Sequence, residues 1–202
     1  MANRSQQLTA ETPRIVVLAG PNGAGKSTSA RFILQGPLNI DEFVNADVIA
    51  QGLSGFEPER AGLAAGRIML SRLKELASAR ASFAFETTLA SRTFAPWIAR
   101  LVESGYEFHL VFLWLPSADA AVARVAERVN RGGHNVPEGT IRRRYIAGLK
   151  NFFELYQSMA AMWQVMDSRG MLPKVIANGG ETQKEVVFEP LLWSQITAKV
   201  KQ

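Results

Sequence analysis

The residues with the clearest chemical meaning form one glycine-rich stretch near the start of the chain. From Gly20 to Ser27 the sequence reads GPNGAGKS, which matches the Walker A pattern G-x-x-x-x-G-K-[ST] at every fixed position. Glycines in such a loop let backbone N–H groups approach a polyphosphate, and the lysine reaches its terminal phosphates as a point charge. The serine hydroxyl that follows is a ligand for Mg²⁺. The stretch therefore predicts a phosphate-binding loop.

The residues on either side of this loop predict a strand before it and a helix after it. The apolar run IVVLA over 15–19 is typical of a buried strand, and the apolar positions of the helix are Ala30, Phe32, Ile33 and Leu34. A helix N-terminus adds unpaired backbone donors and the positive end of the helix dipole. We expect ATP to bind here, with Ser27 also holding Mg²⁺. The predicted nucleotide-binding residues are Gly20, Pro21, Asn22, Gly23, Ala24, Gly25, Lys26, Ser27 and Thr28.

Carboxylates follow two further strand-like runs. FVNAD over 43–47 predicts a short strand ending at Asp47, and SFAFETT over 82–88 predicts a second with Glu86 near its end. Ligands of open α/β sheets bind beyond the carboxyl ends of the strands, so both carboxylates are expected beside the loop. Asp47 is the candidate base for a substrate hydroxyl. Glu86 is the candidate partner of a Mg²⁺-bound water or of the hydroxyl, and a helix cap is the alternative for each.

Arginines are concentrated around a second glycine-bearing loop. The sequence NRGGHNVPEG over 130–139 lies between two helical patterns, and six arginines fall between 124 and 144. We predict a lid over about 128–145, in which Arg128 and Arg131 reach the transferring phosphate. His134 in this loop is either a substrate contact or an exposed histidine. The six arginines are Arg124, Arg128, Arg131, Arg142, Arg143 and Arg144.

The rest of the chain alternates between helical and strand-like patterns. Helices are predicted at about 59–80, 93–104, 118–129 and 140–162 and within 184–200, and strands at 108–115, 164–167 and 174–177. This alternation predicts an α/β fold with a doubly wound, mainly parallel sheet and flanking helices. We expect a flexible arm over 1–12 and one domain over 13–202. Core contacts of the helix at 59–80 are predicted to be Leu63, Ile68, Leu70, Leu73 and Leu76.

Composition limits the classes of protein to which the chain can belong. The 202 residues are 47% hydrophobic without a run long enough for a membrane span, and the polar N-terminus does not resemble a secretory signal. The absence of cysteine excludes disulfides and thiolate chemistry and fits a cytoplasmic protein. A net charge of +5 favours an anionic ligand. Nucleic acid is not favoured, because aromatic residues do not alternate with the arginines.

Four motifs in order carry a resemblance to a known family. They are GPNGAGKST at 20–28, NADVIA at 45–50, FETTLAS at 85–91 and RGGHNVPEGTIRRRY at 131–145. Together they resemble the zeta-toxin family of P-loop kinases, in particular its chromosomal bacterial branch. The resemblance implies an ATP-dependent kinase, and the toxin members of the family phosphorylate UDP-N-acetylglucosamine at a sugar hydroxyl. Those toxins are neutralised by a small helical antitoxin, which makes such a protein a candidate partner.

The same resemblance implies roles for single residues. Lys26 and Ser27 match the phosphate-loop positions, and Asp47 matches the general base. Arg128 and Arg131 match the pair of lid arginines that stabilises the transferred charge. Glu86 and Thr88 match substrate-contacting positions of the family. With Thr87 and Arg92, which lie at or after the end of the same strand, and His134 of the lid loop, they are the predicted substrate-binding residues.

Two alternatives to a small-molecule kinase remain, a P-loop NTPase switch and a nucleic-acid-linked ATPase. The guanine-specific pattern N-K-x-D is absent, and the apolar run at 108–115 is followed by Pro116 and Ser117 rather than by acidic residues typical of hydrolytic motors. Both observations favour a kinase that transfers phosphate to a hydroxyl.

Overall fold

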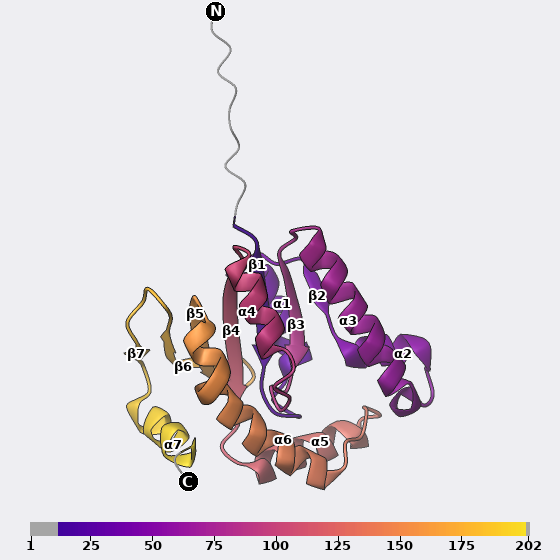
Figure 1. Ribbon diagram of the computed structural model, residues 1–202. Coiled ribbons are helices and arrows are strands. Elements are labelled where there is room, and N and C mark those ends of the chain that lie inside the picture. Colours follow the sequence, from indigo (N-terminus) through magenta and orange to yellow (C-terminus); the bar gives the residue numbers. More distant parts are fainter. Residues whose placement is uncertain (1–11, 201–202) are drawn as a thin grey trace, which may run out of the picture.

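A seven-stranded sheet runs through the computed structural model, which describes residues 12–200 (Figure 1). The strand order is β2-β3-β1-β4-β5-β6-β7. The first five strands of this order are parallel, and β6 runs antiparallel to both of its neighbours, β5 and β7. The strands are β1 (Arg14–Ala19), β2 (Glu42–Val44), β3 (Phe83–Thr87), β4 (Glu107–Trp114), β5 (Met162–Asp167), β6 (Lys174–Gly179) and β7 (Val186–Val187). The predicted doubly wound, mainly parallel α/β sheet is confirmed.

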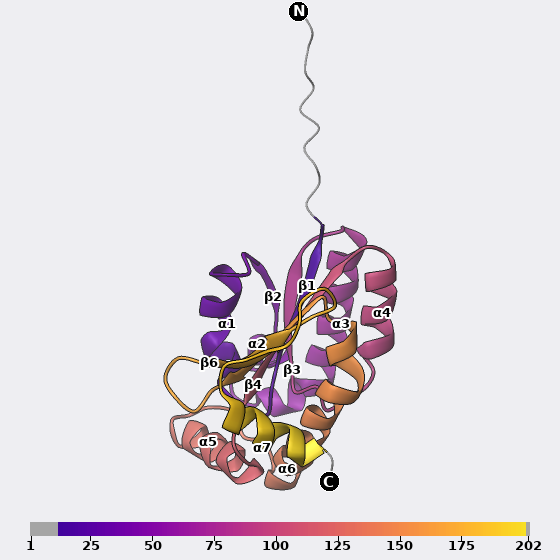
Figure 2. The same cartoon turned by 90° about the vertical axis from the view of Figure 1, so that its left-hand side faces the viewer.

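Helices cover both faces of this sheet. One face is packed by α1 and α5, the other by α3, α4 and α7, and α6 contributes side chains to both. Figure 2 separates α1 from α3 and α4, which lie on opposite sides of the strands. The helices are α1 (Lys26–Gln35), α2 (Ala46–Leu53), α3 (Gly62–Ser78), α4 (Ala95–Glu103), α5 (Ala118–Asn130), α6 (Glu138–Asn151) and α7 (Pro190–Val200). Shorter helical turns are η1 (Pro58–Ala61), η2 (Phe152–Tyr156) and η3 (Gln157–Met159).

Strand β1 lies at the centre of the core. Ile15 and Val17 pack toward one face, and Val16 and Leu18 pack toward the other. All four side chains are fully buried. A parallel strand with helices on both faces must be apolar on both, which explains the unbroken apolar run in the sequence.

The predicted core face of α3 is partly wrong. Leu63, Ile68 and Leu70 are 84%, 43% and 47% exposed, and Phe32 in α1 is 58% exposed. Each helix packs on the sheet along one stripe, so apolar residues outside that stripe face solvent. The buried residues of α3 are Ala65, Met69, Leu73 and Leu76.

The chain after α6 also differs from the prediction. The α-helix expected over 140–162 ends at Asn151. The chain after it forms the π-helical turn η2 and the 3₁₀ turn η3. Ala161 then donates its backbone N–H to Phe108, which brings the chain back to the sheet beside β4. Strand β7, only two residues long, was not predicted.

Two further expectations concern the ends and the membrane. The predicted arm over 1–12 lies outside the described residues except for its last position. Within residues 12–200, none of the helices is long and apolar enough to cross a membrane.

Candidate active site

The loop between β1 and α1 has the backbone that phosphate binding requires. Gly20 has a φ of 140°, and a Cβ there would lie 2.4 Å from the carbonyl oxygen of Leu113 in β4. Gly25 has a φ of 76° and caps α1 without a side chain, which leaves the first N–H groups of the helix free for a ligand. A side chain at either position would disturb the loop.

Lys26 is buried inside this loop. Its Nζ donates to the carbonyl oxygens of Gly20 at 2.9 Å and Pro21 at 3.0 Å, and it lies 3.6 Å from a Glu86 carboxylate oxygen. Burial lowers the pKa of Lys26, although Glu86 and Asp47 oppose that shift. The ammonium is thus desolvated, and a phosphate would supply the strong acceptors that such a cation favours.

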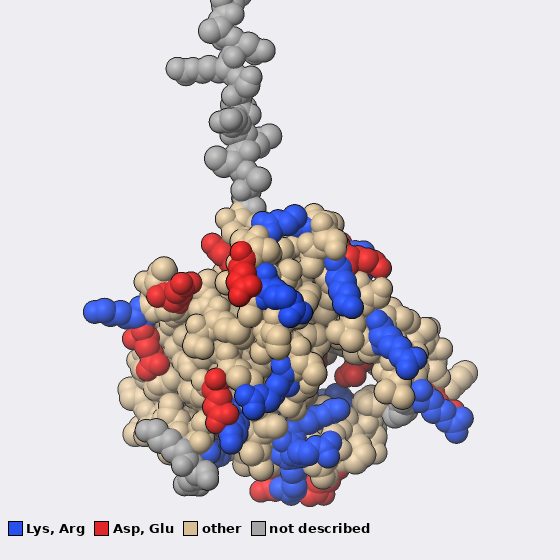
Figure 3. Space-filling view, in the orientation of Figure 1, with Lys and Arg blue, Asp and Glu red and all other residues tan. Residues whose placement is uncertain are grey.

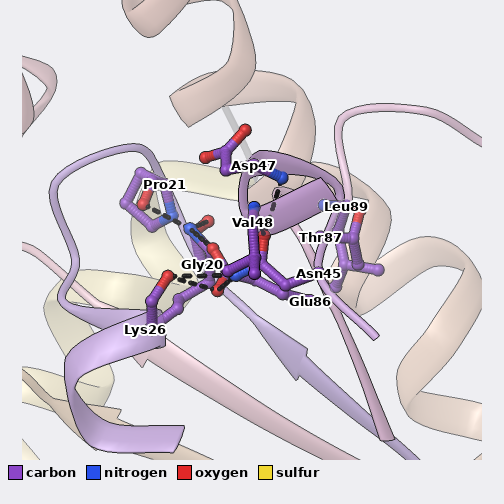
Figure 4. A network of polar contacts seen from close by, with 10 residues as sticks. Gly20, Pro21, Lys26, Asn45, Asp47, Val48, Glu86, Thr87 and Leu89 are labelled. Atoms are coloured by element: carbon purple, nitrogen blue, oxygen red, sulfur yellow. Dashed lines mark hydrogen bonds and ion pairs between the residues drawn. The ribbon is translucent and has the colours of Figure 1, made fainter. Parts of the chain in front are cut away.

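Asn45 and Glu86 belong to a polar network beside Lys26 (Figure 4), and Ser27 joins them through its hydroxyl. The Ser27 hydroxyl donates to Glu86 Oε2 at 2.7 Å. The Asn45 amide donates to the same Oε2 at 2.8 Å and to Ser27 Oγ at 3.2 Å. Glu86 therefore lies in β3 where the sequence predicted it, next to the phosphate loop.

Asp47 is not at the end of a strand, and that prediction is wrong. Strand β2 ends at Val44, and Asn45 begins α2 as its N-cap, with Asp47 in the first turn. The Asp47 backbone N–H donates to Asn45 Oδ1 at 2.8 Å, while its carboxylate is turned away from the network (Figure 4). The asparagine two residues earlier, which is a strong N-cap, explains the difference.

Two cavities meet at this edge of the sheet. The first, which we call the phosphate cavity, has a volume of about 480 Å³. The second, which we call the lid cavity, has a volume of about 500 Å³ and lies between α2 and the α5–α6 loop. Asn22 and Asp47 line both. A group bound in one cavity can therefore contact a group bound in the other at these two residues.

Asn22 is notable because its polar group is unsatisfied. The Asn22 Oδ1 atom is buried and has no hydrogen-bond partner among the described residues. Buried polar atoms are nearly always paired, so an orphaned acceptor at the junction of the two cavities points to a ligand donor.

Three arginines of α5 and its C-terminal end line the phosphate cavity, but two of them are held by backbone carbonyls. Arg124 donates to Ser168 at 2.7 Å and Arg169 at 2.8 Å. Arg128 donates through Nη2 to the His134 carbonyl at 2.6 Å, and its Nε is buried without a partner in the described part of the chain.

Arg131, the third arginine of the phosphate cavity, is 76% exposed and pairs with Glu127 four residues earlier. The two predicted catalytic arginines are therefore both beside the phosphate loop, Arg128 half-buried and Arg131 at the rim.

The three arginines of α6 have different surroundings. Arg142 pairs on the surface with Asp119 at 2.6 Å and Glu138 at 2.8 Å. Arg143 is exposed, whereas Arg144 is half-buried and lines the lid cavity without a partner among the described residues. Figure 3 shows Lys and Arg side chains gathered over α5 and α6 beside a hollow in the surface. The sequence alone did not show which of these three arginines would line the cavity.

The predicted substrate-binding residues divide into two groups. Glu86 lines the phosphate cavity and His134 lines the lid cavity. Thr87, Thr88 and Arg92 line neither, and the Thr87 hydroxyl instead accepts a hydrogen bond from the Leu89 backbone at 3.1 Å. The lid cavity also contains polar residues to which the sequence assigned no role, namely Gln51, Asn135 and Thr140. Arg144 was predicted only as one of the six arginines around the lid.

The donor set at Ser27 fits a magnesium ion. No group of three or more His, Cys, Asp or Glu side chains within residues 12–200 could hold a metal alone. Mg²⁺ needs only one or two protein oxygens when phosphates and waters complete its shell. The adjacent hydroxyl of Ser27 and carboxylate of Glu86 are oxygen ligands of that kind.

These features define a P-loop domain of the kinase-like type, with a central parallel strand leading into the phosphate loop. The chain belongs to the AAA domain family, whose model matches residues 15–146. It is 26% identical over 132 residues to an uncharacterized protein of Haemophilus influenzae, a match that covers 65% of this chain and 92% of that protein.

Solved structures share the fold at low sequence identity. A chain of the AvrRxo1-ORF1:AvrRxo1-ORF2 complex with sulphate ions has a TM-score of 0.73 and 15% identity, covering 93% of this chain. This protein spans 64% of the length of that chain. A chain of the PezAT chromosomal toxin-antitoxin system of Streptococcus pneumoniae has a TM-score of 0.61 and 14% identity, with 98% and 90% of the two chains covered.

Proposed function

We propose that the protein is an ATP-dependent phosphotransferase that moves the γ-phosphoryl group to a hydroxyl of a small molecule. The observation that carries this proposal is the meeting of two cavities at Asp47. One is built around a phosphate loop with Lys26, Arg128 and Arg131, and the other is lined by polar side chains of α2 and the lid. A hydrolytic switch needs room for water alone, whereas a kinase needs a second cavity for its acceptor.

ATP is the proposed phosphate donor. The free N–H groups at the start of α1 and the desolvated Lys26 ammonium are complementary to a polyphosphate. A second crystal structure of the AvrRxo1-ORF1:-ORF2 complex, with a TM-score of 0.71 and 15% identity to this chain, contains ATP. Ser27 and Glu86 are the proposed holders of Mg²⁺, which when bound neutralises charge on the phosphate oxygens.

The transfer itself requires little covalent chemistry from the protein. The acceptor oxygen forms a bond to the γ-phosphorus while the bond to the β–γ bridging oxygen breaks, and ADP leaves. Asp47, whose carboxylate is exposed and lines both cavities, accepts the hydroxyl proton. Lys26, Arg128 and Arg131 stabilise the charge on the moving group.

The proposed acceptor is UDP-N-acetylglucosamine or a related nucleotide sugar, as the zeta-toxin resemblance implies. A cavity of about 500 Å³ lies within the range of small-molecule sites, and Arg144 offers a cation for an anionic part of the acceptor. A cytoplasmic setting and a small antitoxin partner belong to the same proposal, which the fold shared with a PezAT chain supports.

The experiment is a phosphoryl-transfer screen by mass spectrometry. The protein is incubated with ATP, Mg²⁺ and a panel of nucleotide sugars and simple hydroxyl metabolites. We expect a mass gain of one phosphate on a nucleotide sugar. ATP turnover without any phosphorylated acceptor would contradict the proposal and favour an NTPase switch or a nucleic-acid-linked ATPase.

Variants of the two central residues complete this screen. Lys26→Ala should lose ATP binding. Asp47→Asn should retain ATP binding and lose about 10²- to 10⁴-fold in transfer rate, the usual contribution of a general base. Asp41→Asn, an exposed carboxylate outside both cavities, is the matched control. Full transfer by Asp47→Asn would remove the base assignment.

A further inference from the structure

Asn45 lies between the phosphate loop and the helix that carries Asp47. It is 6% exposed and lines neither the phosphate cavity nor the lid cavity. Its amide nitrogen donates to Ser27 Oγ at 3.2 Å and to Glu86 Oε2 at 2.8 Å. Its amide oxygen accepts from the backbone N–H groups of Asp47 at 2.8 Å and Val48 at 3.4 Å.

The chemistry of an amide explains why this position holds asparagine. The carboxylate of Glu86 requires a donor, and the N-terminus of α2 requires an acceptor. An amide supplies both from one rigid group. Aspartate would cap α2 equally well but would place a second carboxylate against Glu86. Serine could cap the helix but has no amide nitrogen to donate to both Glu86 and Ser27.

We propose that Asn45 is a positioning residue, which holds the Ser27–Glu86 pair and the first turn of α2 in one fixed frame. The frame sets the distance between the phosphate side of the site and the Asp47 carboxylate, on which a rate governed by positioning depends. This inference rests on the proposed function, although its contacts are independent of which acceptor is used. Asn45 touches neither phosphate nor acceptor in this role.

Two variants distinguish the role of the Asn45 amide nitrogen from that of the amide oxygen. Asn45→Ser keeps a cap for α2 and loses the donors to Glu86, whereas Asn45→Ala loses both. The phosphate side is measured by binding of a fluorescent ATP analogue with and without Mg²⁺. The helix side is measured by hydrogen exchange of a peptide covering 45–53.

The expected results differ between the variants. In Asn45→Ser the gain in nucleotide affinity on adding Mg²⁺ falls by about tenfold, as loss of a buried hydrogen bond to a charged group predicts, while exchange of 45–53 stays close to wild type. In Asn45→Ala the Mg²⁺ effect falls similarly and the peptide also exchanges faster. With an acceptor identified, kcat falls in Asn45→Ala by about 10²-fold, and the acceptor KM changes little because Asn45 does not line the lid cavity.

Ser117→Ala is the matched control. Ser117 caps α5 through its side chain and lies outside both cavities, so its loss removes a cap of the same kind without touching the frame. It should leave the Mg²⁺ effect unchanged.

A wild-type Mg²⁺ effect in Asn45→Ser would overturn the phosphate-side role, and unchanged exchange in Asn45→Ala would overturn the helix-side role. If the wild-type protein did not bind ATP at all, the proposed function would fail instead. The exchange comparison would still decide whether Asn45 holds α2.

Discussion

At the scale of single residues, the cations of the site differ in whether the described part of the chain provides them with a partner. Lys26, Arg124 and Arg128 donate to backbone carbonyls, which a phosphate could replace as acceptors. Arg144 has no partner among the described residues and lines the lid cavity. Arg144 is therefore the residue of this group whose position favours contact with the acceptor rather than with ATP.

Substitution of Arg144 should weaken binding of the acceptor and leave binding of ATP unchanged. Arg144→Ala is expected to raise the acceptor KM by about tenfold or more while ATP affinity stays unchanged, because a charge-assisted hydrogen bond contributes about 1.5–3 kcal/mol. Steady-state kinetics with each substrate varied in turn would measure this. Arg143→Ala, the exposed neighbour, should behave as wild type. An equal effect of both variants would indicate a general loss of positive charge.

Sequence patterns predicted the loop between β1 and α1, whose glycines have the expected positive φ values, but placed its neighbours less well. A fixed spacing encodes Gly20, Lys26 and Ser27, because one local turn makes the whole cradle. Arg144 could not be distinguished from Arg143, since the choice depends on how α6 rotates against the sheet. Asp47 was placed near the loop for the wrong reason, as part of a strand rather than of a capped helix.

At the scale of elements, α6 and the turns after it support the segment that follows β3. Asn151 donates to the Leu89 carbonyl at 2.7 Å, and the Tyr156 hydroxyl donates to the Ser91 carbonyl at 3.1 Å. Leu89 itself has a φ of 56°, a strained value for a non-glycine residue. These contacts hold the backbone just beyond Glu86 in one conformation.

Gly148 allows this close approach. A Cβ at Gly148 would lie 2.3 Å from the Thr88 carbonyl oxygen, whereas a Cβ at Gly139 of the same helix would meet no atom within 4 Å. Gly148→Ala should lower the free energy of unfolding by about 1–3 kcal/mol through overpacking. Gly139→Ala should have no effect or stabilise slightly, because alanine favours helix. Chemical denaturation of both variants tests this, and equal stability would contradict the contact.

The turn after β5 is closed by an ion pair between Asp167 and Arg169, which makes a pH-dependent contribution to the free energy of unfolding. Burial acts to raise the pKa of Asp167, but the hydrogen bonds and charge of Arg169 outweigh it, and the pKa is lowered. A carboxylate whose pKa is lowered in the folded state stabilises the protein at pH values above the ordinary aspartate pKa. This stabilisation is lost as the pH falls through the folded-state pKa.

Arg169→Gln should therefore lower the free energy of unfolding at pH 7 by at most about 1 kcal/mol, since Arg169 is 50% exposed and the pair is screened by solvent. The difference from wild type should shrink on acidification below about pH 4. Urea unfolding at several pH values measures both. A difference that grew toward acid would have the wrong sign.

The elements themselves were predicted unevenly. Long apolar runs such as 15–19 and 108–115 identify buried parallel strands, because both of their faces must be apolar. The end of α6 could not be predicted, because the continuing turns still satisfy the helical pattern while changing the backbone hydrogen bonds. Exposed apolar residues such as Leu63 carry no signal in the sequence that separates them from core residues.

At the scale of the whole molecule, ATP binding should be coupled to stability. A ligand that binds only the folded state stabilises it by about 2.7 kcal/mol at a hundred times its Kd. For a domain of this size we expect Tm to rise by roughly 5–10 °C in saturating ATP and Mg²⁺. Differential scanning fluorimetry should show this shift in wild type and not in Lys26→Ala. An equal shift in the variant would place the nucleotide elsewhere.

The central position of β1 also has a consequence for synthesis of the chain. Ile15 pairs with Phe83 on one side and with Phe108 on the other, so both neighbours of β1 are translated long after it. Until β4 leaves the ribosome, the apolar run over 15–19 of this strand lacks one of its two neighbours in the sheet. Such distant pairings fold slowly and expose strand edges to aggregation. The phosphate loop can therefore form only late in translation, and chains truncated before residue 114 should depend on chaperones to remain soluble.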